Sequence, residues 1–318
     1  MTQRYRAADL SKAKTIPFAD RKNKVSIDQF AEAPDWKAIT ADPLANLPDV
    51  LAAQDTRTVV DAIVSAHREG RVVLFMLGGH VVKTGCSPLL IDLMRRKVIT
   101  HLAMNGATAI HDYEVARFGQ TSEDVAENLK DATFGMVDET GREMNAAFQQ
   151  GQTHGCGAGE ALARALIDRD AANVNHSLLV AAFETDVPVT VHVAIGAEII
   201  HQHPSCQGAA LGDASYTDFR VLVESLKSLG DGGVVVNVGS AVILPEVFLK
   251  ALTLARNLGA AVNNFKAVNI DMIRHYRPEV NVIGRPVQTG GRGIHITGHH
   301  ELLLPLLYRA IAWRLKDT

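Results

Sequence analysis

The 318-residue sequence predicts an α/β protein with a doubly wound, mainly parallel sheet. Continuous apolar, β-branched runs such as 71–77 and 232–241 are typical of strands that are buried on both faces. Segments with apolar residues at helical spacing lie between such runs, so that strand, glycine loop, helix and strand recur as in a βαβ unit. These units build parallel sheets with right-handed crossovers.

In the first half of the chain, a helix is expected to end at Gly70, followed by the strand 71–77 and the glycine loop 78–85. A helix with basic residues at its C-terminal end follows, then the strand 100–105 and a loop that leads into a helix. Residues 120–170 are mostly helical in pattern and are expected to cap the sheet.

The pattern recurs in the second half. Strands are expected at 187–195 and 232–241, with helices at 215–230 and 244–259 and two further strands at 260–265 and 280–284. The glycine-rich stretch 288–298 is expected to be a loop that wraps a ligand, with a flexible surface hairpin as the alternative. A final helix carries Pro305 in its first turn or at a kink.

The N-terminal segment differs from the rest. Residues 1–48 are charged, contain four prolines and show no sustained period. We therefore divide the chain into an arm, 1–56, and a domain, 57–318. Such an arm packs on a partner subunit or covers a site; a partly ordered terminus is the alternative.

Composition argues against several classes of protein. Hydrophobic residues make up 47%, which suffices for a full core and argues against disorder. A net charge of −3 and 5% aromatic residues argue against nucleic-acid binding. Three cysteines cannot form a disulfide framework. No secretory signal and no run of roughly 18 apolar residues is present, so a cytoplasmic protein that binds no membrane is expected.

Small residues gather where the predicted strands end. In an open α/β sheet, ligands bind beyond the carboxyl ends of the strands, where glycines let backbone N–H groups approach a phosphate. Asp112 and Glu114 follow the second of these loops and are candidate acceptors for ribose hydroxyls. The spacing fits a dinucleotide, although there is no G-x-G-x-x-G after the first strand and such turns require glycine in any case. The candidate residues are Gly78, Gly79, His80, Thr84, Gly85, Asn105, Gly106, Gly212, Asp213, Gly239 and Ser240.

Other polar residues offer chemistry. His201, His203 and Cys206 permit a metal-site interpretation, but their spacing is not that of a structural zinc site, and a loop lining a polar cleft is favoured. Arg292, in the glycine-rich stretch, is a candidate anion contact. No G-x-S-x-G nucleophile signature is present.

Three segments resemble the deoxyhypusine synthase family. VVLFMLGGHVVKTG (72–85) and VITHLAMNGATAIHDYE (98–114) are similar to its first nucleotide-binding loop and its second, acidic one. LGDASYTDFRVLVESLKSLGDGGVVVNVGSAV (211–242) is similar to its Gly-Asp segment, the next helix and its glycine strand end. The first two segments also resemble the NAD-binding domain of archaeal and cyanobacterial ornithine cyclodeaminases.

The resemblance implies a Rossmann-like fold, a tightly bound NAD and a homotetramer with sites between subunits. It implies cofactor contacts at Gly79, His80, Thr84, Gly85, Asn105, Gly106, Asp112, Asp213, Gly239 and Ser240. The family's imine-forming lysine has no counterpart, because the comparable stretch 289–305 holds neither a lysine nor a tryptophan. We therefore expect no lysine-linked intermediate with spermidine, and Lys83 is the one rival candidate for such a role.

The function that we predict is NAD-dependent oxidation of a small amine or alcohol to a transient imine or ketone, followed by transfer or elimination. Asp213 and Glu246 are candidates for holding a substrate ammonium. His203 and His299 are candidates for the general base. The alternatives are a non-catalytic NAD-binding protein and a metal-dependent hydrolase built on the His201 loop.

Overall fold

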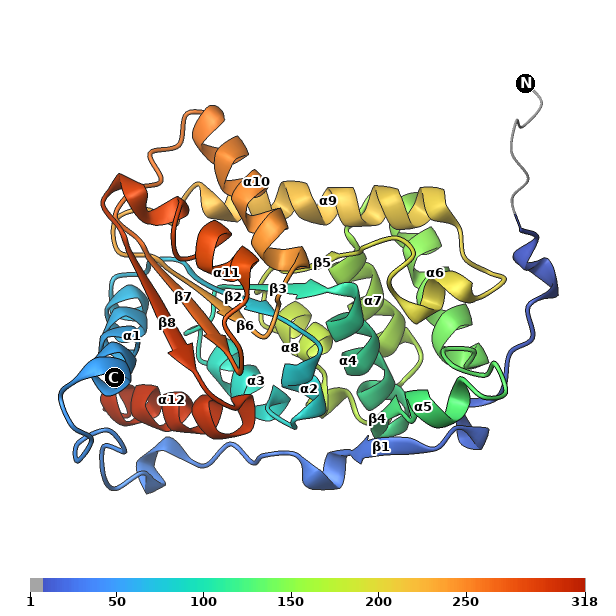
Figure 1. Cartoon of the computed structure of the whole chain (residues 1–318), viewed down its shortest axis with the longest axis horizontal. Helices are drawn as coiled ribbons and strands as arrows, with labels where there is room; N and C mark the ends of the chain where they lie inside the picture. Colours follow the sequence, from blue (N-terminus) through green and yellow to red (C-terminus); the bar gives the residue numbers. More distant parts are fainter. Residues whose placement is uncertain (1–7, 318) are drawn as a thin grey trace.

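The computed structural model describes residues 8–317. Six strands form one parallel sheet in the order β5-β3-β2-β6-β7-β8, so the predicted doubly wound parallel α/β fold is confirmed (Figure 1). A separate two-stranded sheet pairs β1 with β4. The bounds of the main strands are β2 Val73–Leu77, β3 His101–Asn105, β5 Val189–His192, β6 Val234–Val238, β7 Lys266–Asp271 and β8 Arg292–Thr297.

Helices cover both faces of this sheet (Figure 1). One face carries α1 (Leu51–Arg68), α3 (Ser87–Arg95), α8 (Leu178–Glu184) and α12 (His300–Leu315). The other carries α9 (Gly208–Leu226), α10 (Ile243–Asn257) and the short α11 (Tyr276–Asn281). Beside the β5 edge lie α4 (Gly106–Phe118), α6 (Asp138–His154) and α7 (Ala158–Asp168), with the short α2 (His80–Lys83) and α5 (Val125–Asn128) near them.

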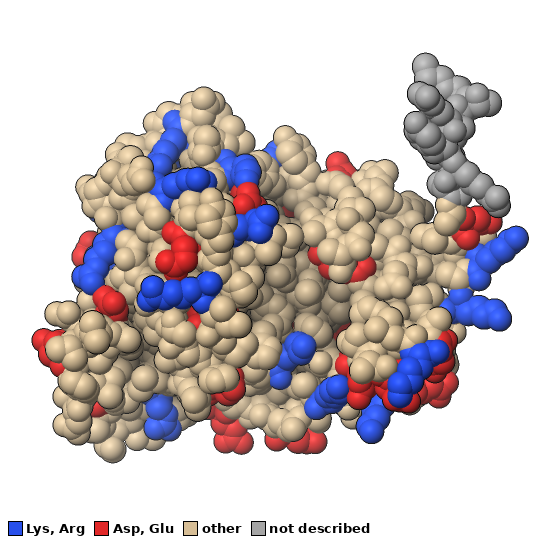
Figure 2. Space-filling model, in the orientation of Figure 1, with Lys and Arg blue, Asp and Glu red and all other residues tan. Residues whose placement is uncertain are grey.

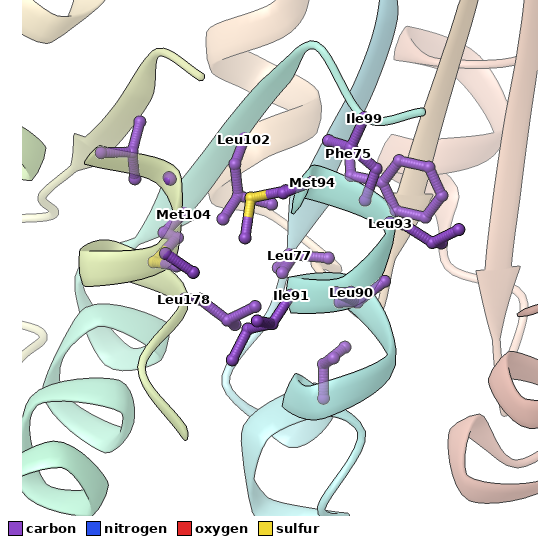
Figure 3. Packing of buried hydrophobic residues seen from close by; sticks show 14 of the residues in the cluster. Phe75, Leu77, Leu90, Ile91, Leu93, Met94, Ile99, Leu102, Met104 and Leu178 are labelled. Atoms are coloured by element: carbon purple, nitrogen blue, oxygen red, sulfur yellow. The ribbon is translucent and has the colours of Figure 1, made fainter. Parts of the chain in front are cut away.

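The alternation of side chains along each strand divides the core between these faces. Phe75 and Leu77 of β2 point toward α3, where Figure 3 shows them with Leu90 and Met94. Leu74 and Met76, the intervening residues of β2, pack with α9 and α10 instead. All four strand residues are buried, which explains why the sequence of β2 is apolar without interruption.

The strand order reverses between β2 and β6. From β2 the chain proceeds through β3 to β5 on one side, and from β6 through β7 to β8 on the other. The loops after β2 and β6 meet at this switch point. A Cβ atom at Gly78 would lie 2.1 Å from the carbonyl oxygen of Gly239, so no larger residue fits there. Such a switch point is where open α/β sheets bind ligands.

The N-terminal arm lies along one side of the domain (Figure 1). Its strand β1 (Asn23–Ser26) pairs antiparallel with β4 (Gln120–Glu123). Farther along, the N–H of Ala31 donates to the carbonyl of Gly85, and the indole of Trp36 donates to Tyr308 on α12. Short 3-10 helices lie at Leu10–Lys12, Phe18–Asp20, Ile27–Gln29 and Trp36–Ala38 in the arm, and at Val174–His176, Ile199–Gln202 and Pro286–Thr289 in the domain.

Some elements differ from the sequence prediction. The helix expected from residue 57 begins at Leu51. Residues 280–284, which were expected to form a strand, instead lie at the end of α11 and in a turn. The strand expected at 260–265 begins later, at Lys266, and is β7. The stretch 288–298 is not a loop throughout, because β8 occupies most of it. Ile294 and Ile296 are buried and alternate with less buried residues, which is the strand pattern that the glycines of this stretch obscure.

Two buried histidines on β3 and β5 are expected to make the fold sensitive to acid. Burial lowers the pKa of both His101 and His192 to about 3, and both bind the hydroxyl of Thr190. Between this value and about 6.5, the unfolded chain binds protons that the folded chain does not, so stability rises with pH by about 1.4 kcal/mol per histidine and pH unit. Urea unfolding of the wild type and of His101→Gln at pH 5 and pH 7.5 measures the effect. An equal pH dependence in the two proteins would contradict it.

Within residues 8–317, no helix is long and apolar enough to cross a membrane.

Candidate functional site

The switch point brings together several of the residues predicted to bind a cofactor. Gly79 and Gly239 are partly exposed at the carboxyl edge of the sheet, whereas the hydroxyl of Ser240 is used inside the protein to accept from the N–H of Leu244. The imidazole of His80 lies 5.5 Å from that of the fully buried His300, measured between ring centroids. The edge therefore offers an exposed glycine cradle, with backbone groups that a phosphate could approach.

A cavity of about 200 Å³ opens beside this edge. Figure 2 shows the corresponding face hollowed near its middle, between the part that carries α10 and α11 and the part that carries α4 and α6. His111 of α4 lines the cavity, and its Cδ2 atom is 3.0 Å from the position of a Cβ atom at Gly79. The cavity thus adjoins the glycine cradle. Its charged lining residues are Arg21, Lys83, Glu114, Glu123 and Glu198.

The arm supplies one of these charges. Arg21 has a side chain that is 1% exposed, and its guanidinium lies 2.9 Å from the carboxylate of Glu114 and 3.8 Å from that of Glu123. Glu114 also accepts from the hydroxyls of Thr121 and Thr140. Arg21 therefore offsets part of the negative charge of the two carboxylates, and the wall that the three groups form depends on a residue distant in sequence.

Two other groups remain available to a ligand. The side chain of Lys83 forms no hydrogen bond or ion pair with any residue in the range 8–317. His111 contacts the hydroxyl of Thr121 through Nδ1 at 2.8 Å, which leaves Nε2 free. Burial, and then the positive charges of Lys83 and Arg21, lower the pKa of His111 to about 3. At neutral pH the cavity thus presents an uncompensated ammonium beside a neutral imidazole.

Glu198 lies on the loop that follows β5 and lines the same cavity. Its Oε1 atom accepts from the N–H of Ala194 at 2.9 Å. Burial raises the pKa of this carboxyl to about 7. A Cβ atom at Gly106 would lie 2.5 Å from Oε1, so the carboxyl rests directly on the first residue of α4. Sequence reasoning missed Glu198, although its place just after a buried strand was a usable signal.

Several of the predicted cofactor residues lie in internal roles. The side chain of Asn105 caps α4 by accepting from the N–H of Thr108. Gly85 is covered by the arm, because a Cβ atom there would lie 2.9 Å from the Cα atom of Phe30. The hydroxyl of Thr84 donates to the carbonyl of His80.

Two further predicted segments lie elsewhere. Asp112 is 0% exposed, and its carboxylate accepts from the hydroxyl of Ser177 and from the N–H groups of Leu178 and Leu179 at the start of α8. Gly212 and Asp213 lie within α9 and not in a strand-end loop.

The four predicted catalytic residues are not joined by any hydrogen bond or ion pair in the part of the chain that the structure describes. His203 contacts Ser205 through Nδ1 and Asp138 through Nε2. Glu246 on α10 pairs with Lys250 and Arg277. The other two are exposed, His299 at the start of α12 and Asp213 on α9.

Across residues 8–317, no group of three or more His, Cys, Asp or Glu side chains is placed to hold a metal ion. The loop containing His201 and Cys206 instead contributes to hydrogen bonds. The Nδ1 atom of His201 accepts from the N–H of Gly196, and the side-chain amide of Gln149 donates to the carbonyl of Ser205.

The sheet order and the switch-point glycines define a Rossmann-like fold. Among solved structures, AgrE in complex with ornithine and NAD+ is 14% identical over 85% of this chain and 35% of its own, with a TM-score of 0.51. A putative LOR/SDH protein from Methanococcus maripaludis is 15% identical over 86% of this chain and 72% of its own, with a TM-score of 0.50. A putative deoxyhypusine synthase from Entamoeba histolytica is 11% identical over 87% of this chain and 95% of its own, with a TM-score of 0.49.

At these identities the matches show the fold, and at that level the resemblance predicted from the sequence is confirmed. The chain spans about a third of the length of AgrE and of ArgZ, an arginine dihydrolase from cyanobacteria. No protein-family model and no curated protein matches the chain.

Proposed function

We propose that the protein is an NAD-dependent enzyme that oxidises a carbon bearing an amine or a hydroxyl to a transient imine or ketone. The observation that carries this proposal is the cavity beside the switch point, because it places an open space with charged lining residues next to a glycine cradle. Gly79 and Gly239 fit a dinucleotide, since both are partly exposed where two loop backbones meet. NAD, when bound, supplies the acceptor for a hydride.

The cavity supports a substrate with an amine. Its available groups are the ammonium of Lys83, the neutral ring of His111 and the carboxyl of Glu198. An ionised Glu198 would attract an ammonium, while Lys83 would attract an anionic group on the same substrate. The similar fold of AgrE, solved with ornithine and NAD+, makes L-ornithine the first substrate to test.

We expect the wild-type protein to bind NAD and Gly79→Ala to bind it at least about tenfold more weakly. A Cβ atom at Gly79 would occupy the cradle and approach His111 to 3.0 Å. Equilibrium dialysis measures the affinity, and the melting temperature should rise with NAD in the wild type only.

Gly208→Ala is the matched control, because a Cβ atom at this α9 position meets no atom within 4 Å. A wild type that binds no NAD at millimolar concentration would contradict the proposal. NAD binding without NADH formation from any amine or alcohol would instead favour the non-catalytic alternative.

We also propose a homo-oligomer, with a tetramer as the expected state. Three large apolar side chains are exposed in the segments that follow β5 and β7, at the carboxyl edge of the sheet. The exposed fractions are 65% at Ile195, 63% at Ile273 and 70% at Tyr276. Ile273 and Tyr276 are three residues apart after β7, and neighbouring exposed apolar side chains of this kind are typical of surfaces that a second subunit covers.

Sedimentation is expected to give a species well above 34.3 kDa for the wild type and a smaller one for Ile273→Asp. Leu258→Asp is the matched control, because Leu258 is 59% exposed but follows α10 at the opposite end of the sheet. A wild type that sediments as a monomer at micromolar concentration would overturn this proposal.

A further inference from the structure

We infer that Glu198 is the catalytic residue that moves the proton in the proposed oxidation, and that His201 is the positioning residue that orients it. The inference rests on the proposed function. It deepens that function by assigning acid–base chemistry to two side chains of the loop after β5.

The place of Glu198 suits a residue that touches substrate. Its carboxyl lines the cavity and lies against Gly106, where β3 passes into α4. Any side chain at Gly106 would occupy the space of this carboxyl, since a Cβ atom there would lie 2.5 Å from Oε1. The reactive group is therefore held at the carboxyl edge of the sheet, on the same side as the glycine cradle.

Hydrogen bonds fix the tautomer of His201. The N–H of Gly196 donates to Nδ1 of His201 at 3.0 Å, so the neutral ring carries its proton on Nε2. That Nε2 atom lies 3.3 Å from Oε2 of Glu198. Their side chains are 7% and 5% exposed, and neither atom has a hydrogen-bond partner within residues 8–317. The N–H of His201 is thus the polar group beside Oε2 of Glu198, while the N–H of Ala194 holds Oε1.

The surroundings leave Glu198 able to change its protonation state. Burial raises its pKa to about 7 and lowers the pKa of His201, so neither is locked in a charged form at neutral pH. Arg21 pairs with Glu114 at 2.9 Å and lies 3.8 Å from Glu123, so it offsets part of the negative charge of these two carboxylates. A carboxyl that titrates near the working pH can accept a proton and return it. The other titratable groups that face the cavity are Lys83 and His111.

For an amine substrate, the proposed step conserves atoms and charge. The substrate ammonium gives one N–H proton to the carboxylate of Glu198, which becomes a neutral carboxylic acid. With NAD+ bound at the glycine cradle, the C–H bond on the carbon that bears the nitrogen would then break, and its electron pair would leave with the hydrogen as hydride to that acceptor. The nitrogen lone pair forms the new carbon–nitrogen double bond. The products are the iminium ion, NADH and protonated Glu198, and the total charge is unchanged.

The histidines predicted from the sequence as bases are less suited to this step. Both ring nitrogens of His203 already contact side chains, namely Ser205 and Asp138. His299 has a side chain that is 63% exposed and contacts Glu301. Neither lines the cavity.

Carbon-13 NMR of the ligand-free protein, labelled at the glutamate carboxyl carbons, tests the inference. The signal that disappears in Glu198→Gln should titrate near pH 7. His201→Ala should raise its midpoint by about one pH unit, because the ionised carboxylate loses the polar N–H group that lies 3.3 Å from Oε2. His201→Gln, which keeps an N–H donor, should restore most of the shift. A midpoint near the ordinary glutamate value, or no response to His201→Ala, would overturn the inference.

Access from the cavity is tested with methylammonium chloride, which should lower the midpoint relative to sodium chloride at equal ionic strength. An unchanged midpoint would show that an amine cannot reach the carboxyl, and would also overturn the inference. Where NADH forms from an amine, Glu198→Gln should retain NAD binding and lose turnover by about 10²–10⁴-fold. NAD dialysis of the wild type separates a failure of the proposed function from a failure of this assignment.

Discussion

Replacing Arg21 by methionine is expected to destabilise the protein by about 3–5 kcal/mol. The guanidinium is the partner of the buried Glu114, whose side chain is 1% exposed, and it lies 3.8 Å from Glu123. Methionine keeps most of the side-chain volume but no charge. Two carboxylates would then remain in a buried wall without their cation, which costs far more than the loss of a surface ion pair.

Urea unfolding of wild type and variant measures this effect. Lys24→Met is the matched control, since Lys24 lies on β1, close to Arg21 in the arm, and pairs with Asp124 at the surface, with a side chain that is 53% exposed. The control should change stability by about 1 kcal/mol or less. Equal effects of the two substitutions would contradict a buried ion-pair role for Arg21.

The fold could be predicted because its signals are local. The apolar run of β2 and the glycines after β2 and β6 mark buried strands and tight turns without knowledge of distant residues. The strand β8 was harder, because it is only half buried and its glycines resemble those of a loop. Gly212 was placed in a loop for the same reason, although α9 continues through it.

The cavity could not be predicted in the same way, because its walls come from segments far apart in the chain. Arg21 reaches Glu114 only after β1 pairs with β4, and no periodicity in the sequence indicates that pairing. Glu198 could have been predicted, because it lies in the loop after β5, just as the predicted glycines lie in the loops after β2 and β6. A carboxyl group without a glycine motif nonetheless carries little signal in a single sequence.

The role that the sequence predicts for Asp112 differs from the role that the structure shows. The sequence predicts a contact with a ribose hydroxyl, whereas the structure places the carboxylate at the start of α8. There it accepts from the hydroxyl of Ser177 and the N–H groups of Leu178 and Leu179, at 2.7–3.1 Å. Both carboxylate oxygens are thereby occupied, and the side chain is fully buried.

Asp112→Ala is therefore expected to lower the free energy of unfolding by about 3 kcal/mol or more, because it leaves buried donors without an acceptor. Asp213→Ala makes the same change at an exposed position of α9 and should alter stability by about 0.5 kcal/mol or less. Urea unfolding, together with NAD dialysis of the folded variants, separates the two roles of Asp112. A residue that holds α8 changes the free energy of unfolding and leaves the Kd for NAD nearly unchanged. A residue that contacts the ribose would instead raise the Kd for NAD and leave the free energy of unfolding nearly unchanged. That result would support the prediction that Asp112 binds the cofactor.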